Sequence, residues 1–391
     1  MGIEQRYNHV VEAMLDYVET GRTDQAVSTL RIPARSYTDA ARWEREMELI
    51  FLRVPLLVAL SAELPAPGDF KTLEILGKPL LITRLADGGV RAMLNVCKHR
   101  GMLLADQPCG NRRQFTCRYH AWSYGNDGSL RGVSDPQKFG EVDKATLGLT
   151  QLPVYERAGL VFAVLTPGLP TDFESFFGGM LEDLDRIGLA GWHYCGKREL
   201  SGANWKIAYD GYLEGYHFAA AHPQTIAPRT FSNVMHFEAH GPHMVVGFPQ
   251  RGIAKLRGVP REELWRHECD GFDFVRTLFP NVSVFVAPEI TQVSLLLPGP
   301  RPDQNRTILL FLQRTAPANE AEAAQTTQMM DFLHRVVDEE DYKVGLEVQR
   351  GLESGAMDAV IFGRNERGNQ YFHRWVDWYL ADDPDAPVPA L

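Results

Sequence analysis

The sequence contains no apolar run that approaches the roughly 18–20 residues of a membrane-spanning helix. Its first residues, MGIEQRYNHVVEAML, lack the basic, then apolar, then small-residue order of a secretory signal. A net charge of −10 argues against a nucleic-acid partner, which favours a basic face. These absences predict a cytoplasmic protein with no membrane span and no nucleic-acid partner.

Cysteine is also scarce, with five in 391 residues. An odd, sparse set in a long chain argues against a disulfide framework and leaves metal binding or burial as free thiols. The remaining composition is ordinary for a globular protein, with 45% hydrophobic and 23% charged residues. The length fits two domains.

The pattern of apolar and turn-forming residues changes near residue 53. A helix is predicted over 38–52, where apolar residues share one face. From about 53 to 167, short apolar runs alternate with turn sequences such as Asn126-Asp127-Gly128, which predicts an all-β module. We therefore divide the chain into an N-terminal helical segment (1–52), this module (53–167) and a third part (168–391), on which the N-terminal segment packs.

The third part has a mixed pattern. Helices are predicted over 204–220 and 320–353. The predicted strands are 244–248, 282–287, 291–297 and 307–313. Strands grouped between helices, without strict βα alternation, predict an α+β domain.

The β module carries a first set of candidate ligands, Cys97-x-His99 and Cys117-x-x-His120. Three interpretations stay open from the residues alone. They are buried thiols beside incidental histidines, a tetrahedral zinc site, or a [2Fe–2S] cluster with both thiolates on one iron and both imidazoles on the other. Zinc sites usually pair like ligands in each knuckle, whereas each pair here mixes Cys with His, which favours the cluster.

This pattern resembles the C-x-H … C-x-x-H signature of Rieske proteins. The surrounding sequences, CKHRG at 97–101 and YHAW at 119–122, are similar to the oxygenase branch of that family. The respiratory-complex branch has an extra disulfide, and Met102 and Tyr119 occupy those cysteine positions here. Ala121 stands where the oxygenases more often have Gly, and we expect no functional consequence. The resemblance implies a Rieske-type [2Fe–2S] cluster bound by Cys97, His99, Cys117 and His120.

A second set of candidate ligands lies in residues 204–223. On an ideal helix His217 and His222 would be about 140° apart, since each residue advances about 100°. They can meet on one metal only if the helix is distorted, and two glycines and Pro223 weaken or end it there. Taken alone, the segment is also compatible with two polar helix positions.

Two elements of this region resemble the catalytic segment of ring-hydroxylating oxygenase α subunits: NWK at 204–206, and Glu214-x-x-His217-x-x-x-x-His222-Pro223. The resemblance implies that His217 and His222 bind a mononuclear Fe(II), with a distant carboxylate completing the facial triad. It also implies that Glu214, where most of the family has Asp, relays electrons from the cluster to this iron.

The third iron ligand is expected in the predicted helix 320–353. The acidic run 339–341 followed by EVQRGL at 347–352 is similar to the family's "E-D … E-x-V-Q-R-G-L" element, and matched to it Asp341 is the ligand. An acidic run on a helix is more often a solvated face. Glu340 and Asp338 are the alternative ligands.

The resemblance extends over nearly the whole chain and implies a fold and an activity. The fold is an all-β Rieske domain plus a helix-grip catalytic domain, in which a curved antiparallel sheet surrounds helices. The activity is that of a terminal oxygenase, which activates O₂ at an iron with open positions and draws electrons from the cluster. A head-to-tail homotrimer is also implied, in which Glu214 contacts His217 of its own chain and His120 of the next.

The electron source and the substrate are less defined. The sequence has no Gly-x-Gly-x-x-Gly loop and no further run of ferredoxin-type cysteines, so we expect an external NAD(P)H-dependent reductase, with or without a ferredoxin. We expect hydroxylation of a small aromatic substrate, with demethylation of an aryl ether or oxidation of a quaternary amine as alternatives. A Rieske electron carrier without chemistry and a zinc-stabilised binding protein are the alternatives of other classes.

Overall fold

The computed structural model describes residues 2–383 and 385–391. The chain forms two compact units. The larger comprises Met1–Ile50, Glu174–Arg186 and Trp192–Leu391, and the smaller comprises Phe51–Phe173 and Ile187–Gly191. The predicted boundaries fall after residues 52 and 167, whereas the smaller unit begins at Phe51, continues to Phe173 and also takes in Ile187–Gly191 from the predicted third part.

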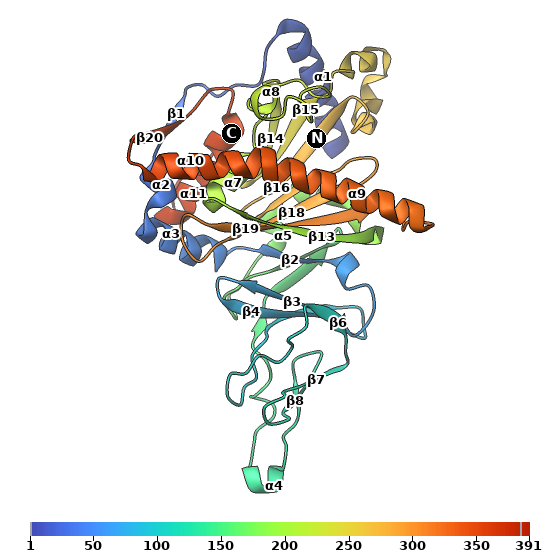
Figure 1. Ribbon diagram of the computed structural model, residues 1–391, viewed down its shortest axis with the longest axis vertical. Coiled ribbons are helices and arrows are strands. Elements are labelled where there is room, and N and C mark those ends of the chain that lie inside the picture. Colours follow the sequence, from blue (N-terminus) through green and yellow to red (C-terminus); the bar gives the residue numbers. More distant parts are fainter. Residues whose placement is uncertain (1, 384) are drawn as a thin grey trace. The chain divides into compact units, whose positions relative to one another are not determined.

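The smaller unit is built from antiparallel strands (Figure 1). A five-stranded sheet has the order β10-β5-β4-β3-β6, and two three-stranded sheets have the orders β11-β12-β2 and β7-β8-β9. The strands are β2 (Leu56–Leu60), β3 (Asp69–Ile75), β4 (Lys78–Arg84), β5 (Val90–Leu94), β6 (Cys109–Asn111), β7 (Gln114–Thr116), β8 (Ser123–Gly125), β9 (Leu130–Gly132), β10 (Gln151–Leu152), β11 (Val154–Arg157) and β12 (Leu160–Ala163). One short helix, α4 (Pro136–Phe139), lies in the loop after β9.

The core of the smaller unit surrounds two of its cysteines. Cys97 and Cys117 are buried in one hydrophobic cluster with Phe70, Phe115 and Trp122. The rings of Phe70 and Phe115 meet edge to face with centroids 5.2 Å apart, an arrangement that aromatic pairs favour. The packed side chains of this cluster therefore support the loops that follow β5 and β7.

A seven-stranded antiparallel sheet forms the centre of the larger unit, in the order β13-β19-β18-β17-β16-β15-β14. Its strand β18 (TQVSLLLP), which has neighbours on both sides, is buried along its whole length, which indicates cover on both faces. The strands are β13 (His193–Gly202), β14 (His236–His240), β15 (His243–Pro249), β16 (Phe272–Leu278), β17 (Val282–Phe285), β18 (Thr291–Pro298) and β19 (Asn305–Gln313). A separate pair, β1 (Leu30–Pro33) and β20 (Ala359–Phe362), joins the two ends of the chain.

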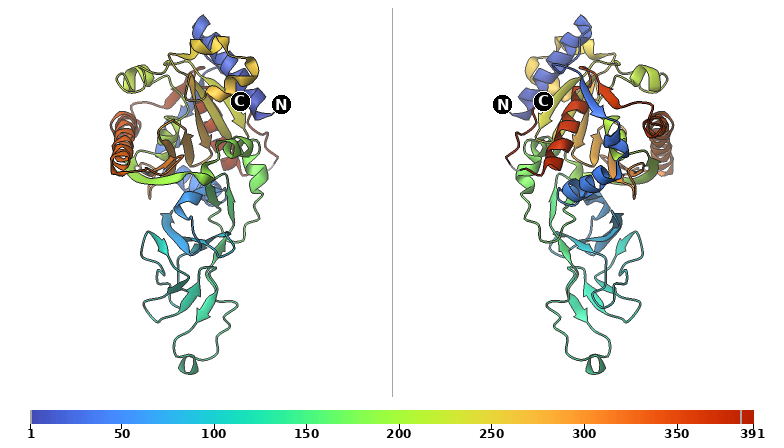
Figure 2. Two further views of the ribbon diagram at one scale, coloured as in Figure 1. Left: turned by 90° about the vertical axis from the view of Figure 1, so that its right-hand side faces the viewer. Right: turned by 90° about the vertical axis from the view of Figure 1, so that its left-hand side faces the viewer.

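A long helix lies across one face of this sheet (Figures 1 and 2). It consists of α9 (Glu320–Val336), a π-helical turn η6 (Val337–Tyr342) and α10 (Lys343–Glu353), and so covers the predicted range 320–353. Asn319 caps it, since its side chain accepts from the amide of Glu322 at 3.0 Å. The cluster that joins helix and sheet comprises Leu200, Ile290, Leu309, Phe311, Met330, Val337 and Tyr342.

The predicted single helix over 204–220 is wrong. The structure has two short helices, α7 (Trp205–Asp210) and α8 (Phe218–Ala221), with no helix between them. Gly215 lies in the gap, where an added Cβ would come within 2.7 Å of the Phe218 ring. The chain therefore leaves the helix after α7, and a new helix begins at Phe218.

The predicted helix over 38–52 is present as α3 (Ala40–Glu46), which continues without a gap into a π-helical turn η1 (Met47–Phe51), and the short α2 (Arg35–Thr38) precedes it. The other α-helices are α1 (Ile3–Thr20), α6 (Met180–Ile187) and α11 (Arg367–Ala381), and α5 (Phe173–Phe177) begins at the last residue of the segment Phe51–Phe173. The larger unit also contains the 3₁₀-helices η4 (Ile253–Gly258) and η5 (Arg261–His267). Among the described residues, no helix has both the length and the apolar character needed to cross a membrane.

Candidate metal centres

The first candidate centre is formed by two loops with the same backbone geometry. In each loop the cysteine amide donates to the carbonyl five residues on, and the amide four residues on donates to the cysteine carbonyl. The four bonds are Cys97 N to Met102 O (2.9 Å), Gly101 N to Cys97 O (3.0 Å), Cys117 N to Trp122 O (2.8 Å) and Ala121 N to Cys117 O (2.8 Å). Gly101 and Ala121 both have positive φ, at 76° and 58°. The two loops are thus equivalent, and each presents one thiol and one imidazole.

The two imidazoles of this centre lie side by side. The rings of His99 and His120 have centroids 4.6 Å apart, and His99 also stacks on Trp122 at 4.9 Å. Nδ1 of His120 is buried and has no hydrogen-bond partner within the described part of the chain. A buried nitrogen without a partner is costly, so its lone pair fits a metal ligand. The donor set of two thiols and two imidazoles suits a [2Fe–2S] cluster of the Rieske type.

Tyr124 is a residue of this centre that the spacing of Cys and His did not reveal. Its hydroxyl accepts from the Lys98 amide at 3.0 Å and lies 3.4 Å from Cys97 Sγ. Because the oxygen already accepts the hydrogen bond of the amide, the hydroxyl can donate its own proton in a hydrogen bond to the sulfur. Burial and this contact raise the pKa of Tyr124, so the hydroxyl stays a donor. Hydrogen bonds to cluster sulfurs adjust the reduction potential.

The second candidate centre lies in the larger unit, at the two ends of α8. His217 precedes this helix and His222 follows it, and their ring centroids are 5.1 Å apart. Nε2 of His222 is 2.9 Å from Asp341 Oδ1, and Nε2 of His217 is 3.6 Å from the same oxygen. One ligand atom from each of the three lies within 4.8 Å of the others, a spacing that can hold a metal ion. His222 has already left the helical backbone conformation, with φ −120° and ψ 47°, so the two histidines do not keep the spacing of an ideal helix.

Two further carboxylates hold the outer nitrogens of these rings. Glu214 contacts Nδ1 of His217, and Glu340 Oε2 lies 2.6 Å from Nδ1 of His222. Thr225 donates its hydroxyl to the same Glu340 oxygen. Metal-binding histidines almost always donate the N–H of their second ring nitrogen to such a partner. Glu340 therefore lies on the side of His222 away from Asp341, and Asp338, the other alternative ligand, is exposed.

The charges of this centre favour a cation. Burial disfavours a charged His217, but its bonds to Asp341 and Glu214 raise the pKa of the imidazole to about 10. Although burial also opposes the charge of Asp341, the two imidazoles hold the pKa of its carboxyl below the usual range. Three carboxylates thus face two rings. A divalent metal ion in place of the protons satisfies both rings and carboxylates.

Two family models match the chain. Residues 54–155 match the Rieske [2Fe-2S] domain, and residues 189–382 match the ring hydroxylating alpha subunit (catalytic domain). The two matched regions contain the two candidate centres described above. The chain belongs to the Rieske non-haem iron oxygenases.

Named members of the family match over different lengths. The carnitine monooxygenase oxygenase subunit of Escherichia coli strain K12 is 28% identical over 370 residues, which cover 90% of this chain and 94% of that subunit. The anthranilate 1,2-dioxygenase large subunit of Acinetobacter baylyi is 32% identical over 206 residues, 49% of this chain, and the match spans 42% of that subunit. Among solved structures, the quaternary ammonium Rieske monooxygenase CntA has a TM-score of 0.78 at 25% identity, covering 91% of this chain and 96% of that chain.

Membership in the Rieske oxygenases confirms the predicted enzyme class, an oxidoreductase that uses O₂, and its cofactors, a Rieske [2Fe–2S] cluster and a mononuclear iron. It also confirms the predicted fold, a Rieske domain plus a catalytic domain with helices against an antiparallel sheet. Naphthalene 1,2-dioxygenase from Rhodococcus, with a TM-score of 0.75 at 20% identity over 96% of this chain and 99% of that chain, has the same fold.

Proposed function

We propose that this chain is the terminal oxygenase of a multicomponent system, with the cluster on Cys97, His99, Cys117 and His120 and Fe(II) on His217, His222 and Asp341. The observation that carries the proposal is the convergence of two imidazole Nε2 atoms on Asp341 Oδ1, at 2.9 and 3.6 Å. Two histidines and one carboxylate are the facial donor set of non-haem Fe(II) oxygenases. Such an iron supplies open positions for O₂, and the cluster supplies electrons one at a time.

The protein's own residues orient the iron ligands. Glu214 accepts from Nδ1 of His217 and Glu340 accepts from Nδ1 of His222, which fixes the tautomer that leaves both Nε2 atoms free. His222 is fully buried, so its ring has no freedom to turn away. Phe218 packs against both imidazoles, with centroids at 5.0 and 6.0 Å, and shields them on one side.

Glu214 also connects the two metal centres in this proposal. In a head-to-tail homotrimer, it would accept from His217 of its own chain and from His120 of the next chain. Exposed tyrosines flank both proposed contacts, since Tyr216 is 58% exposed and Tyr119 is 56% exposed. Aromatic residues of this kind are enriched at protein interfaces. A solved quaternary ammonium Rieske monooxygenase, 25% identical with a TM-score of 0.76 over 91% of this chain and 96% of that chain, is described as transferring electrons between subunits.

Electrons reach the cluster from an external NAD(P)H-dependent reductase, with or without a ferredoxin. Exposed cations lie around the cluster loops at Lys98, Arg100 and Arg118, and Arg118 pairs with Asp106 at 3.1 Å. An acidic electron donor would approach this surface favourably. A cytoplasmic location belongs to the same proposal, because reduced nicotinamide is supplied there.

The substrate we propose is a small aromatic compound that receives one or two oxygen atoms. A quaternary amine is the second candidate, and two observations favour it. The carnitine monooxygenase subunit matches along 94% of its length, whereas the anthranilate dioxygenase subunit matches along 42%. The excess of carboxylates around the second centre also suits a cationic substrate.

A substrate panel tests this function. The protein, reconstituted with cluster and Fe(II), receives electrons from a surrogate reductase, and O₂ uptake is measured together with product identity for arenes, aryl methyl ethers and quaternary amines. A hydroxylated arene supports the first candidate, and a tertiary amine with an aldehyde supports the second. The Asp341→Ala variant is the control for uncoupled O₂ consumption. If no substrate gives an oxygenated product above this control, the proposal of a terminal oxygenase fails.

A further inference from the structure

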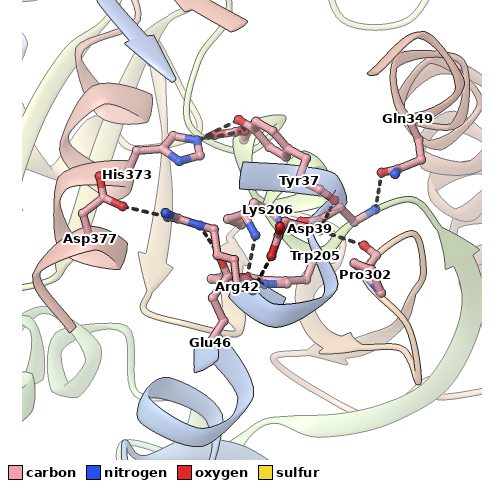
Figure 3. Close-up of polar contacts among 12 residues, drawn as sticks. Tyr37, Asp39, Arg42, Glu46, Trp205, Lys206, Pro302, Gln349, His373 and Asp377 are labelled. Carbon is pink, nitrogen blue, oxygen red and sulfur yellow. Dashed lines mark hydrogen bonds and ion pairs between the residues drawn. The ribbon is translucent and has the colours of Figure 1, made fainter. Parts of the chain in front are cut away.

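Helix α7, which leads to the iron-binding segment, is held by an unusual number of buried polar contacts (Figure 3). Lys206, in its first turn, is fully buried and forms an ion pair with Glu46 at 2.5 Å. Trp205 donates to the same Glu46 oxygen at 2.8 Å. Just before the helix, the Asn204 amide donates to Gln349 of α10 at 3.1 Å, so α7 is tied to the helix that carries Asp341.

The C-terminal end of α7 is held by a second set of contacts, all made to Asp210. The Tyr37 hydroxyl donates to Asp210 Oδ2 at 2.9 Å. His373 Nε2 lies 3.1 and 3.2 Å from the two carboxylate oxygens and 3.0 Å from the Tyr37 oxygen. Since a carboxylate only accepts, Nε2 of His373 carries the ring proton. Tyr37 and His373 are both at most 2% exposed, so water does not compete for these bonds.

Helix α11 fixes the backbone at the same point. Asn369 Nδ2 donates to the Asp210 carbonyl at 3.0 Å and to its carboxylate at 3.2 Å. One residue earlier, Gly368 approaches the next part of the chain so closely that a Cβ would lie 2.8 Å from the Leu213 carbonyl. The side chain of Asp210, its carbonyl and the carbonyl of Leu213 are therefore all located by elements from opposite ends of the sequence.

These contacts to Asp210 lie immediately before the residues that form the proposed iron site. Between Asp210 and α8 the chain has no helix or strand, and it carries Glu214 and His217. A segment without regular backbone hydrogen bonds takes its path from its fixed ends. The far end is held where the Asn233 amide donates to the Gly215 carbonyl at 2.9 Å. The near end is held by the contacts to Asp210.

We propose that Tyr37, Asn369 and His373 are positioning residues of the oxygenase, which act through Asp210 to place Glu214 and His217 at the iron. The inference rests on the proposed function, since it takes His217 as an iron ligand. It goes beyond the ligands because the three residues lie outside the metal-binding motif and none of them touches an iron ligand. Outer contacts of this kind typically change metal affinity about 10- to 100-fold.

The chain offers a matched pair of buried tyrosines for the test. Tyr37 donates its hydroxyl to Asp210, whereas Tyr371, also buried, donates its hydroxyl to the Gly241 carbonyl at 2.6 Å. Tyr37→Phe and Tyr371→Phe each remove one hydroxyl and the hydrogen bond that it donates, and Tyr37→Phe also removes the contact of that oxygen with His373. The dissociation constant for Fe(II) is measured on cluster-loaded protein that lacks the mononuclear iron, together with kcat, KM and thermal unfolding, at a temperature where all variants are folded.

We expect similar loss of thermal stability in both variants, but weaker Fe(II) binding, by about 10-fold, only in Tyr37→Phe. Asp210→Asn, which keeps the shape of the side chain, should weaken Fe(II) binding at least as much and lower kcat more than it raises KM. Normal Fe(II) affinity in both Tyr37→Phe and Asp210→Asn would overturn the inference, and if Tyr37→Phe does not fold, Asp210→Asn decides. Retention of the mononuclear iron in the His217→Ala variant would instead reject the proposed iron site.

Discussion

Ala121 has a φ of 58°, in the left-handed region where residues with a Cβ are strained. Gly101 occupies the equivalent place in the other cluster loop, at φ 76°. The sequence marked Ala121 as a departure from the family but gave no reason for a cost, because the backbone angle of a loop residue is not visible in spacing. The structure supplies the reason. An L-residue in this conformation is destabilised by about 1–2 kcal/mol of backbone strain. Gly removes this strain, but it loses about 0.5–1 kcal/mol more conformational entropy on folding.

Ala121→Gly should therefore stabilise the cluster loop by up to about 1 kcal/mol without changing the cluster absorption. The matched control is Gly101→Ala, whose new Cβ would meet no atom within 4 Å, so that only backbone strain is added. The midpoint of thermal unfolding of the cluster-loaded protein should rise in the first variant and fall in the second. A lower midpoint in Ala121→Gly would refute the strain at this residue.

His243 shows why the histidines outside the metal centres can be satisfied core residues. It lies between Phe176 and Phe177, with ring centroids at 4.8 and 5.2 Å. Its Nε2 donates to the Phe176 carbonyl at 2.9 Å, and its Nδ1 accepts from the Phe279 amide at 3.0 Å. Both nitrogens are used in the neutral state. Burial therefore lowers the pKa of His243 to about 3.

This arrangement predicts that stability falls as the pH drops below about 6.5. The unfolded chain binds a proton at His243 near pH 6.5, whereas the folded chain does so only near pH 3, so the unfolded state gains protons in this window. At pH 5 the loss is on the order of 2 kcal/mol for this one group. His243→Gln should unfold with a smaller change in midpoint between pH 7 and pH 5 than wild type. An equal change in both proteins would contradict the assignment.

At the scale of elements, the sequence predicted those whose pattern is local. The strands β15, β17, β18 and β19 lie where apolar runs predicted them, and the helix over 320–353 begins and ends as predicted. The prediction of one helix over 204–220 failed because the break depends on distant partners. Gly368 of α11 and the contacts to Asp210 come from residues far away in the chain. No spacing within the segment reveals them.

The π-helical turn η6 places two consecutive carboxylates around one ring. Asp341 faces Nε2 of His222 at 2.9 Å, and Glu340 faces Nδ1 at 2.6 Å. The sequence named Asp341 as the ligand only through the family resemblance and kept Glu340 as an alternative, because neighbours in an acidic run look alike. Single π-helical turns inside α-helices are frequent at functional sites.

Three variants separate these roles. Asp341→Ala should lose the mononuclear iron and the activity while the cluster spectrum is unchanged, because the two centres use different ligands. Glu340→Gln should retain iron with an affinity lower by about 10-fold. Asp338→Ala is the control in the same acidic run and should behave as wild type, since Asp338 is exposed. If iron content after Asp341→Ala equals that of wild type, the third ligand lies elsewhere.

At the scale of the whole molecule, turnover requires electrons to pass from a cluster to an iron. In the proposed trimer Glu214 joins the ligands of the two centres, and the assembly should have about three times the chain mass of 44.0 kDa. Glu214→Gln keeps the side-chain shape but removes the charge that orients both imidazoles. We expect both metals to be retained and reoxidation of the reduced cluster, with substrate and O₂ present, to slow by about 10- to 100-fold. Wild-type reoxidation in this variant, or full activity in a monomer, would rule out this route.

The claim that one chain holds both metal centres is tested most directly by metal and sulfide analysis of the purified protein, combined with electron paramagnetic resonance after reduction. The account predicts three irons and two acid-labile sulfides per chain, with the resonance of a reduced Rieske cluster. A colourless protein that contains zinc, or one that carries iron without labile sulfide, would contradict it.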